Sequence, residues 1–320
     1  MSRWISRAGI GALLAVAMSA GAHAAPAELS IMAPAGPGGG WDQTARAMQA
    51  ALQEAGIVPN VQVTNVPGAG GTIGLAQFVN TAKGSPNQLI VGGYVMVGAI
   101  IANASPVSLA DVTPIARLTG EYEAIVVPKD SPIQTIADLV DALKKDVGAV
   151  SWAGGSAGGA DHIAVGLIAK AAGVDASKIN YVPFSGGGEA LAAILGNQVT
   201  AGISGYGEFS GQVQSGDLRL LAVSAPERLA GVDAPTLKES GLDVEVQNWR
   251  MVAGGPDLTD EQKADLVSTV EAMAKSEQWK ATLASKGWID TFLAGDDFAT
   301  YIKQQVETTT AALKEIGVVK

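Results

Sequence analysis

The chain has 320 residues and a formal net charge of −10, with 21 basic residues, 31 acidic residues, two histidines and no cysteine. This acidic balance argues against nucleic acid as a partner, because such binding depends on neutralising phosphates. The lack of cysteine excludes disulfides and, with so few histidines, disfavours a metal site built from soft ligands. We therefore expect neither a metal nor a cofactor.

The first 24 residues predict a signal peptide that is not part of the fold. Arg3 and Arg7 form a positive region, residues 11–22 are apolar, and a small-x-small cleavage site ends at Ala24. The apolar stretch is shorter than the roughly 20 residues that a membrane span needs. We expect export to the periplasm and a mature chain that begins at Ala25.

Beyond the signal peptide, strand-like runs alternate with helical patterns, which is typical of α/β proteins with mostly parallel sheets. The predicted strands cover residues 28–33, 61–66, 89–91, 124–127, 149–153, 179–182, 199–203, 218–224 and 244–252. Helical periodicity covers residues 42–55 and 161–172, and residues 92–102 are expected to form a loop after a buried strand. One further helix is predicted after a capping box formed by Thr259 and Gln262. A final helix carries the apolar residues Phe298, Ile302, Val306 and Leu313.

Four glycine-rich segments each follow a predicted strand and open a helix, at residues 34–42, 65–74, 152–162 and 182–190. They form two pairs of similar spacing, as if one strand–loop–helix plan were used twice. The first N–H groups of a helix lack internal partners, the helix dipole is positive there, and glycine lets a ligand approach the backbone. Tight turns explain any single segment, but two matched pairs favour a site for a small acid between two lobes.

Competing motifs fit less well. No segment matches G-x-G-x-x-G or a phosphate-binding loop, which disfavours dinucleotide and nucleotide binding. Residues 154–158 (GGSAG) do match the G-x-S-x-G elbow of serine hydrolases. A catalytic triad also needs a histidine from elsewhere in the fold, and the mature chain has only His162, close to Ser156 in sequence. A secreted hydrolase using Ser156 is therefore the alternative to a binding protein that is not an enzyme.

Three polar residues each have two interpretations. Asp42 stands where an N-cap is expected, and its other role is to organise the loop or hold a water molecule. His162 is either a ligand donor, which we favour, or a polar residue in the first turn of its helix. Arg250 lies in an otherwise apolar strand, where it either pairs with an acidic side chain or reaches a ligand carboxylate.

Two apolar, strand-like stretches near residues 124–128 and 218–224 are suited to carry the chain between two lobes. Each is followed by a charged segment that contains proline. We therefore expect a first lobe of residues 25–125 and 226–320, and a second lobe of residues 126–225.

The same segments carry a family resemblance. They are PAGPGGGWDQTAR (34–46), NVPGAGGTIG (65–74), GGSAGGADH (154–162), VPFSGGGEA (182–190) and NWR (248–250), in this order behind a signal peptide. The chain resembles the substrate-binding proteins of tripartite tricarboxylate transporters, the Bug family. The resemblance implies an α/β fold of the type II periplasmic-binding-protein kind, with two lobes that close on a ligand in the cleft between them.

The resemblance also implies a function. Such proteins deliver a small acid to integral-membrane permease subunits, and Trp41 with residues 248–250 looks most like the tricarboxylate-binding members. We therefore expect a monomeric receptor for citrate or a related di- or tricarboxylate. A receptor that reports the bound ligand to a membrane kinase is the alternative output.

Carried over by position, the resemblance names the ligand-binding residues. In the first lobe, two loops would grip one carboxylate through backbone N–H groups and ordered waters, at Gly38, Gly39, Asp42, Gly68, Ala69, Gly70 and Thr72, and Trp41 is a further expected ligand contact. The second lobe would add Ser156, Gly158, His162, Ser185 and Gly186, and Arg250 would be a further contact. The second-lobe loop 157–160 has fewer hydroxyl groups than in many relatives, which bears on the contacts to the distal part of the ligand. We expect the second pair of glycine-rich segments to decide which acid binds.

Overall fold

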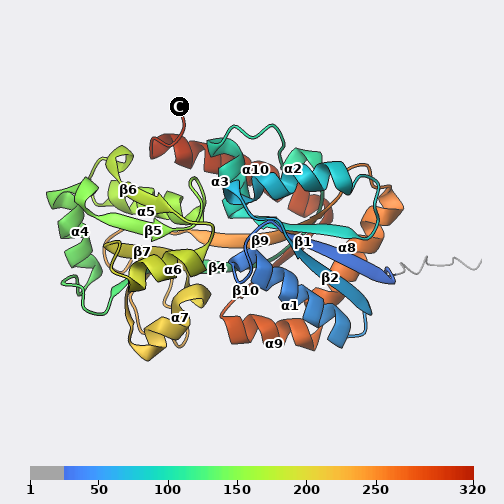
Figure 1. Ribbon diagram of the computed structural model, residues 1–320, viewed down its shortest axis with the longest axis horizontal. Helices are drawn as coiled ribbons and strands as arrows, with labels where there is room; N and C mark the ends of the chain where they lie inside the picture. Colours follow the sequence, from blue (N-terminus) through green and yellow to red (C-terminus); the bar gives the residue numbers. More distant parts are fainter. Residues whose placement is uncertain (1–24) are drawn as a thin grey trace, which may run out of the picture.

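The computed structural model describes residues 25–320, so the predicted signal peptide lies outside the described residues. The described chain forms two α/β lobes side by side, joined by strands that run through the middle of the molecule (Figure 1). The predicted α/β, two-lobed architecture is thereby confirmed.

The first lobe contains a sheet in the order β2-β1-β3-β9-β4, with β10 paired to β4. Its strands are β1 (Glu28–Ala33), β2 (Asn60–Asn65), β3 (Gln88–Gly93), β4 (Thr113–Pro128), β9 (Gln247–Gly254) and β10 (Ile289–Ala294). β1 is parallel to β2 and β3, whereas β9 is antiparallel to β3 and β4. The helices of this lobe are α1 (Gly40–Glu54), α2 (Thr72–Thr81), α3 (Tyr94–Ala102), α8 (Asp260–Lys275), α9 (Glu277–Lys286) and α10 (Gly295–Glu315).

The second lobe contains β4 again, followed in the sheet by β7, β5 and β6, with β8 paired to β4. The added strands are β5 (Ser151–Gly154), β6 (Asn180–Pro183), β7 (Ala201–Gly205) and β8 (Leu218–Val223), and the helices are α4 (Ile136–Lys145), α5 (Ala160–Ala171), α6 (Gly187–Leu195) and α7 (Tyr206–Ser215). Single 3₁₀ turns are η1 (Ala69–Gly71), η2 (Leu109–Asp111), η3 (Val147–Ala149) and η4 (Ala176–Lys178). β5 is parallel to β6 and β7, so the carboxyl ends of these strands share one edge of the sheet.

β4 passes from one lobe into the other. Its first part pairs with β9, and its second part, from Glu123, pairs with β7. After β8 the chain stays with the second lobe for some distance, because Leu237, Leu242 and Val244 pack in the same core as Ile125. The predicted lobe boundaries remain a proposal, and these contacts favour moving the second crossing from residue 226 toward residue 246.

Four predicted elements differ from the structure, and one of them is the strand predicted at residues 124–127, which belongs to β4 and begins already at Thr113. Residues 94–102 form the helix α3 and not a loop, because a helix that is apolar nearly all round shows no amphipathic period. The strand predicted at 244–252 begins only at Gln247, although Leu242, Val244 and Val246 are buried and alternate with exposed residues like a strand. Helix α1 begins at Gly40 and not at Asp42.

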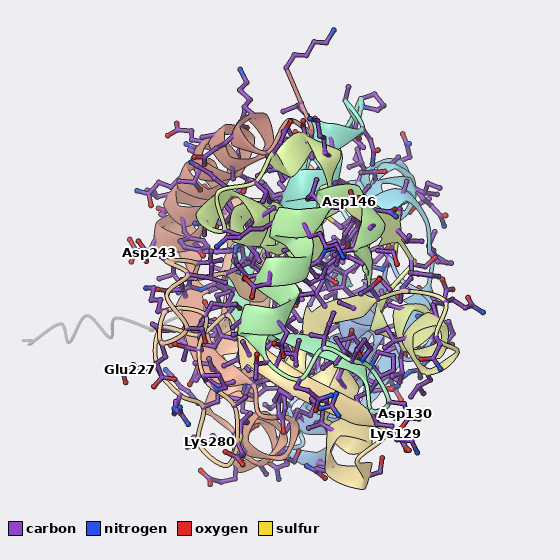
Figure 2. All side chains as sticks on the ribbon, turned by 90° about the vertical axis from the view of Figure 1, so that its left-hand side faces the viewer. Lys129, Asp130, Asp146, Glu227, Asp243 and Lys280 are labelled. Atoms are coloured by element: carbon purple, nitrogen blue, oxygen red, sulfur yellow. The ribbon has the colours of Figure 1, made fainter. Side chains whose placement is uncertain are left out.

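Many charged side chains lie at the surface of the molecule. Figure 2 shows Lys129, Asp130, Asp146, Glu227 and Asp243 at the surface, and all five are exposed. Within residues 25–320, no helix has both the length and the apolar character needed to cross a membrane.

Candidate functional site

The four glycine-rich loops meet at one cavity of about 370 Å³ between the lobes. They contact one another in pairs across the cleft. A Cβ added at Gly186 would lie 3.8 Å from Gly39 Cα, and one added at Gly70 would lie 3.4 Å from Ser156 Cβ. The first lobe lines the cavity with Pro34, Ala35, Gly40, Trp41, Gly68, Ala69, Gly70, Gly71, Val95, Asn103, Asn248 and Arg250, and the second lobe with Gly155, Ser156, Ala157, Asp161, Pro183, Phe184, Ser185, Gly186, Gly187, Glu189, Ser204 and Glu208.

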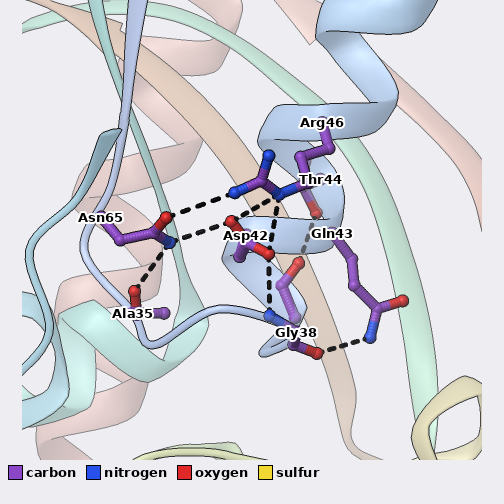
Figure 3. A network of polar contacts seen from close by, with 8 residues as sticks. Ala35, Gly38, Asp42, Gln43, Thr44, Arg46 and Asn65 are labelled. Atoms are coloured by element: carbon purple, nitrogen blue, oxygen red, sulfur yellow. Dashed lines mark hydrogen bonds and ion pairs between the residues drawn. The ribbon is translucent and has the colours of Figure 1, made fainter. Parts of the chain in front are cut away.

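Asp42 organises the loop before α1, and the prediction that it is the N-cap is wrong. Gly39 is the N-cap, and Asp42 is the third residue of the helix. Its carboxylate accepts hydrogen bonds from Gly38 N–H (2.8 Å), Asn65 Nδ2 (2.9 Å) and Arg46 Nε (3.0 Å), as Figure 3 shows. Burial by itself would raise the pKa of Asp42, but these hydrogen bonds and the Arg46 charge hold the pKa below its ordinary value. The side chain is thus a loop organiser, which was its alternative interpretation.

The loop between β2 and α2 is shaped by glycine. Gly70 and Gly71 have φ angles of 62° and 87°, which residues with a Cβ rarely adopt. Trp41 packs directly on Gly71, where an added Cβ would lie 2.6 Å from its ring. Thr72 Oγ1 donates a 2.9 Å hydrogen bond to the Ala69 carbonyl, so this hydroxyl group is used within its own loop.

The loop before α5 repeats the arrangement at Asp42 with a different side chain. His162 is the third residue of α5, and its Nδ1 accepts a 3.0 Å hydrogen bond from Gly158 N–H. The imidazole stacks on the Tyr181 ring with centroids 4.3 Å apart. Burial lowers the pKa of His162 to about 4, so the ring is neutral at pH 7 and serves as an acceptor for its own loop.

These hydrogen bonds within the loops use backbone N–H groups that were predicted to bind a ligand. The N–H groups of Gly38 and Gly158 donate to Asp42 and His162, and Ser185 N–H donates to Glu189 Oε2 at 3.1 Å. In contrast, the first N–H groups of α1 have no acceptor within the helix, and Gly40 and Trp41 line the cavity. In the first lobe, the backbone donors beside the cavity that the helix leaves unpaired are therefore those at the start of α1.

Arg250 pairs with an acid and also lines the cavity. Its Nη2 forms a buried ion pair with Glu121, and its Nη1 donates to Thr44 Oγ1 at 3.3 Å. The guanidinium lies over the Trp288 ring, 4.8 Å from the centroid. A Cβ added at Gly40 would lie 2.5 Å from Nη2, which places the guanidinium charge at the N-terminus of α1. The structure shows the acid pair, and the ligand contact remains a prediction.

Several carboxyl groups surround this guanidinium. Glu121 and Glu123 are buried on β4, and within the described chain one oxygen of Glu121 and both oxygens of Glu123 have no hydrogen-bond partner. Burial raises the pKa of Glu121, although the Arg250 charge opposes the shift. Burial and the charges of Asp161, Glu121 and Glu208 raise the pKa of Glu123 well above its ordinary value. Burial likewise raises the pKa of Asp161 to about 7.

The predicted site residues divide into two groups. Those that line the cavity are Trp41, Gly68, Ala69, Gly70, Ser156, Ser185, Gly186 and Arg250. Those that lie behind the lining and shape the loops are Gly38, Gly39, Asp42, Thr72, Gly158 and His162.

Sequence reasoning did not name six polar lining residues as ligand contacts, namely Asn103, Asp161, Glu189, Ser204, Glu208 and Asn248. Asp161 stands inside a glycine-rich segment, and its place in the first turn of a predicted helix was a usable signal. Ser204 and Glu208 lie at the junction of β7 and α7, where no glycine cluster marks a binding loop. Ser204 Oγ donates to Glu208 Oε2 at 2.6 Å.

The geometry does not assemble a serine nucleophile. Within residues 25–320 no hydrogen bond joins Ser156 to His162, whose Nδ1 is occupied by Gly158 N–H. The same residues contain no group of three or more side chains placed to hold a metal ion. The arrangement of loop glycines, helix ends and one guanidinium is suited to binding.

Comparison with known proteins agrees with this arrangement. A family model described as the tripartite tricarboxylate transporter family receptor matches residues 44–318. BugT of Bordetella pertussis is 25% identical over 294 residues, which cover 90% of this chain and 89% of that protein.

Solved structures share the fold over nearly the whole chain. The periplasmic binding protein BugD has a TM-score of 0.79 and 24% identity, and the match covers 91% of this chain and 98% of that one. MatC of Rhodopseudomonas palustris with bound malate has a TM-score of 0.77 and 22% identity, with coverage of 90% and 99%. Another R. palustris protein, Rpa4515 with adipate, has a TM-score of 0.81 and 21% identity, with coverage of 91% and 97%. The fold is that of the periplasmic binding proteins, and the chain belongs to the tripartite tricarboxylate transporter family of receptors.

Proposed function

We propose that this chain is a periplasmic receptor that binds a small carboxylate and delivers it to the permease of a tripartite tricarboxylate transporter. The observation that carries the proposal is the meeting of four loops around one cavity, with the N-terminus of α1 and Arg250 at its wall. Unpaired N–H groups at a helix end and a guanidinium are the groups that hold a carboxylate in proteins.

The ligand class and the location rest on supporting observations. Malate and adipate in two solved relatives support small dicarboxylates as first probes. A citrate-like di- or tricarboxylate, to which the sequence resemblance points, is the corresponding prediction for this chain. The sequence of residues 1–24 supports export to the periplasm, and membership of the family supports a permease as the partner that receives the ligand.

Calorimetry and thermal unfolding of the mature chain test the proposal. The ligands are citrate, tricarballylate, malate, succinate, adipate and glutamate. We expect at least one of them to bind and to stabilise the protein, by about 2.7 kcal/mol at a free concentration of 100 times Kd. No heat of binding and no thermal shift with any carboxylate would overturn the proposal.

A lining substitution shows whether binding occurs in the cavity. Ser156→Leu places a bulky side chain in the cavity wall, so we expect affinity to fall at least about tenfold while the fold is retained. Gly188→Ala is the control, because a Cβ at Gly188 meets nothing within 4 Å and the residue does not line the cavity. Equal affinity of Ser156→Leu and the control would place the ligand elsewhere.

A further inference from the structure

We infer that the second-lobe side of the cavity selects a ligand that carries an ammonium group as well as a carboxylate, and that Glu208 determines this specificity. The inference rests on the proposed function, namely that the first-lobe side of the cavity holds a carboxylate. It narrows the ligand class from acids in general to zwitterionic acids.

The charged residues that line the cavity are divided unevenly between the lobes. Among residues 25–320, Arg250 is the sole cationic side chain in the lining, and it belongs to the first lobe. The lining acids Asp161, Glu189 and Glu208 all come from the second lobe. The charge of Arg250 is already matched by its buried pair with Glu121. Within the described chain Arg250 forms its ion pair with Glu121, although its Nη2 and Glu208 Oε1 both lie close to Gly40, 2.5 Å and 3.1 Å from an added Cβ. The second-lobe wall therefore presents more carboxyl groups than the one lining guanidinium can pair with.

Glu208 lies where a second ligand carboxylate would otherwise be held. Its Oε1 would be 3.1 Å from a Cβ added at Gly40, and its Oε2 would touch one added at Gly187. The carboxylate is thus between the N-terminal ends of α1 and α6, which attract anions. Ser204 Oγ fixes it with a 2.6 Å hydrogen bond. Because an internal carboxylate holds this place, a second carboxylate of a ligand would be repelled there.

Asp161 extends the acidic wall on the same side. Its side chain is buried, it lines the cavity, and its Oδ2 is held by Gly155 N–H at 2.7 Å. Behind it lie the buried oxygens of Glu121 and Glu123 that have no hydrogen-bond partner within the described chain. A buried acid without a donor is costly, and a nearby positive charge lowers that cost. Two separate features, the acidic lining and the nearby carboxyl oxygens without a donor, therefore favour a cationic group in the cavity, because it would stabilise the ionised form of these acids.

The cationic group that fits is organic. No three of the acidic side chains in the described chain are placed to hold a metal ion. An ammonium group carries one positive charge and three hydrogen-bond donors on a compact centre, which suits carboxylates that come from different helices. Replacing that ammonium by a hydroxyl removes the charge, and replacing it by a carboxylate reverses it.

Matched ligands test the inference by calorimetry on the mature chain. Aspartate, malate and succinate differ only in carrying an ammonium, a hydroxyl or a hydrogen at one carbon, and 4-aminobutanoate differs from glutarate in one terminal group. We expect an ammonium ligand to bind at least about tenfold more tightly than its matched partner. Glu208→Gln, which retains an acceptor for Ser204 Oγ, is expected to reduce that ratio about tenfold.

The controls separate this inference from the proposed function. Glu227→Gln changes an exposed carboxylate and should leave the ratio unchanged, and a thermal melt of each variant verifies the fold. If malate, succinate or glutarate binds as tightly as its ammonium partner in every set, the inference is overturned and the carboxylate receptor stands. An unchanged ratio in Glu208→Gln overturns the role of Glu208. Absence of binding by every acid overturns the receptor proposal itself.

Discussion

Glu123 is a carboxyl group on the strand that joins the two lobes, and it has neither a hydrogen-bond donor within the described chain nor any exposed surface. Its neighbours include Glu121, Asp161 and Glu208, and their charges, after the larger effect of burial, raise its pKa well above the ordinary value. A group in these surroundings remains protonated at pH values where a free glutamate is charged. The strand between the lobes thus contains an acid that resists ionisation.

This raised pKa predicts how stability depends on pH. The folded state holds the Glu123 proton above the pKa of the unfolded chain, so the stabilisation is present at low pH and is lost as pH rises toward the folded pKa. The amide side chain introduced by Glu123→Gln is neutral at every pH, so this variant does not lose that stabilisation as the pH rises. When the pH is raised from 5 to 8, we expect the free energy of unfolding of the variant to increase by at least about 1 kcal/mol relative to that of the unmodified protein. This corresponds to about 2–4 °C in Tm.

The measurement is thermal unfolding of both proteins at the two pH values. His162, whose pKa is lowered to about 4 by burial, changes stability with the opposite sign, but it is present in both proteins and its effect cancels in the difference. Lys129→Gln, which changes an exposed charge, is the control. Parallel pH profiles for Glu123→Gln and the unmodified protein would contradict the prediction.

Asp42 and His162 show how far a single residue can be understood from sequence. Both occupy the third position of a helix and accept a hydrogen bond from a loop glycine four residues earlier. Their spacing within similar glycine-rich segments was visible in the chain. The direction in which the two side chains point was not visible in the sequence, because it depends on Asn65 and Tyr181, which come from neighbouring strands. Hence the sequence located both residues at the loops but could not separate loop organisers from ligand contacts.

Among the helices and loops, α3 meets the loop before α5 across the cleft. A Cβ added at Gly98 would collide with the carbonyl group of Gly158, and one added at Gly158 would lie 2.6 Å from Ala102 Cβ. This approach of two backbones brings the lobes together beside the cavity. It requires glycine at position 98, because any side chain there would move one backbone away from the other.

Gly98→Ala should therefore force α3 away from the second lobe. We expect a loss of about 1–3 kcal/mol in stability, the usual cost of overpacking, and weaker binding of whichever acid binds the unmodified protein. Thermal unfolding and calorimetry measure the two effects. Gly211→Ala on α7 is a matched control, since a Cβ there meets nothing within 4 Å and alanine favours the helix. Equal behaviour of the two variants would show that the contact does not position the lobes.

At the scale of the whole molecule, α10 links the two lobes in addition to the strands that cross between them. It packs along the first lobe through Phe298 and Ile302, whereas Leu313 and Ile316 at its end pack with Ile163 of α5. Figure 1 shows this helix along one side of the molecule, with the C-terminus above the second lobe. The crossings between lobes therefore include a helix as well as strands.

Removing one buried side chain at the end of α10 should destabilise the part of the second lobe that it contacts. Leu313 is fully buried, so Leu313→Ala is expected to cost about 2–5 kcal/mol. Hydrogen exchange should show faster exchange in α5 as well as in the end of α10. Lys314→Ala, one residue on and exposed, should change neither. Faster exchange confined to α10 would contradict the proposed link between the lobes.

Features that depend on neighbours in the chain could be predicted from the sequence. Strands followed by glycine loops and helices predicted the α/β lobes, and the same segments carried the family resemblance. Lining residues such as Trp41, Gly70 and Ser185 could be identified because each lies in a glycine-rich loop at a helix start, which is a local property.

Features that join distant residues required the folded chain. Arg250 meets Glu121 across 129 positions, and Glu208 reaches the cavity from a segment with no glycine motif. Burial and charge at such places depend on which strands and helices pack together, and no local pattern encodes that packing.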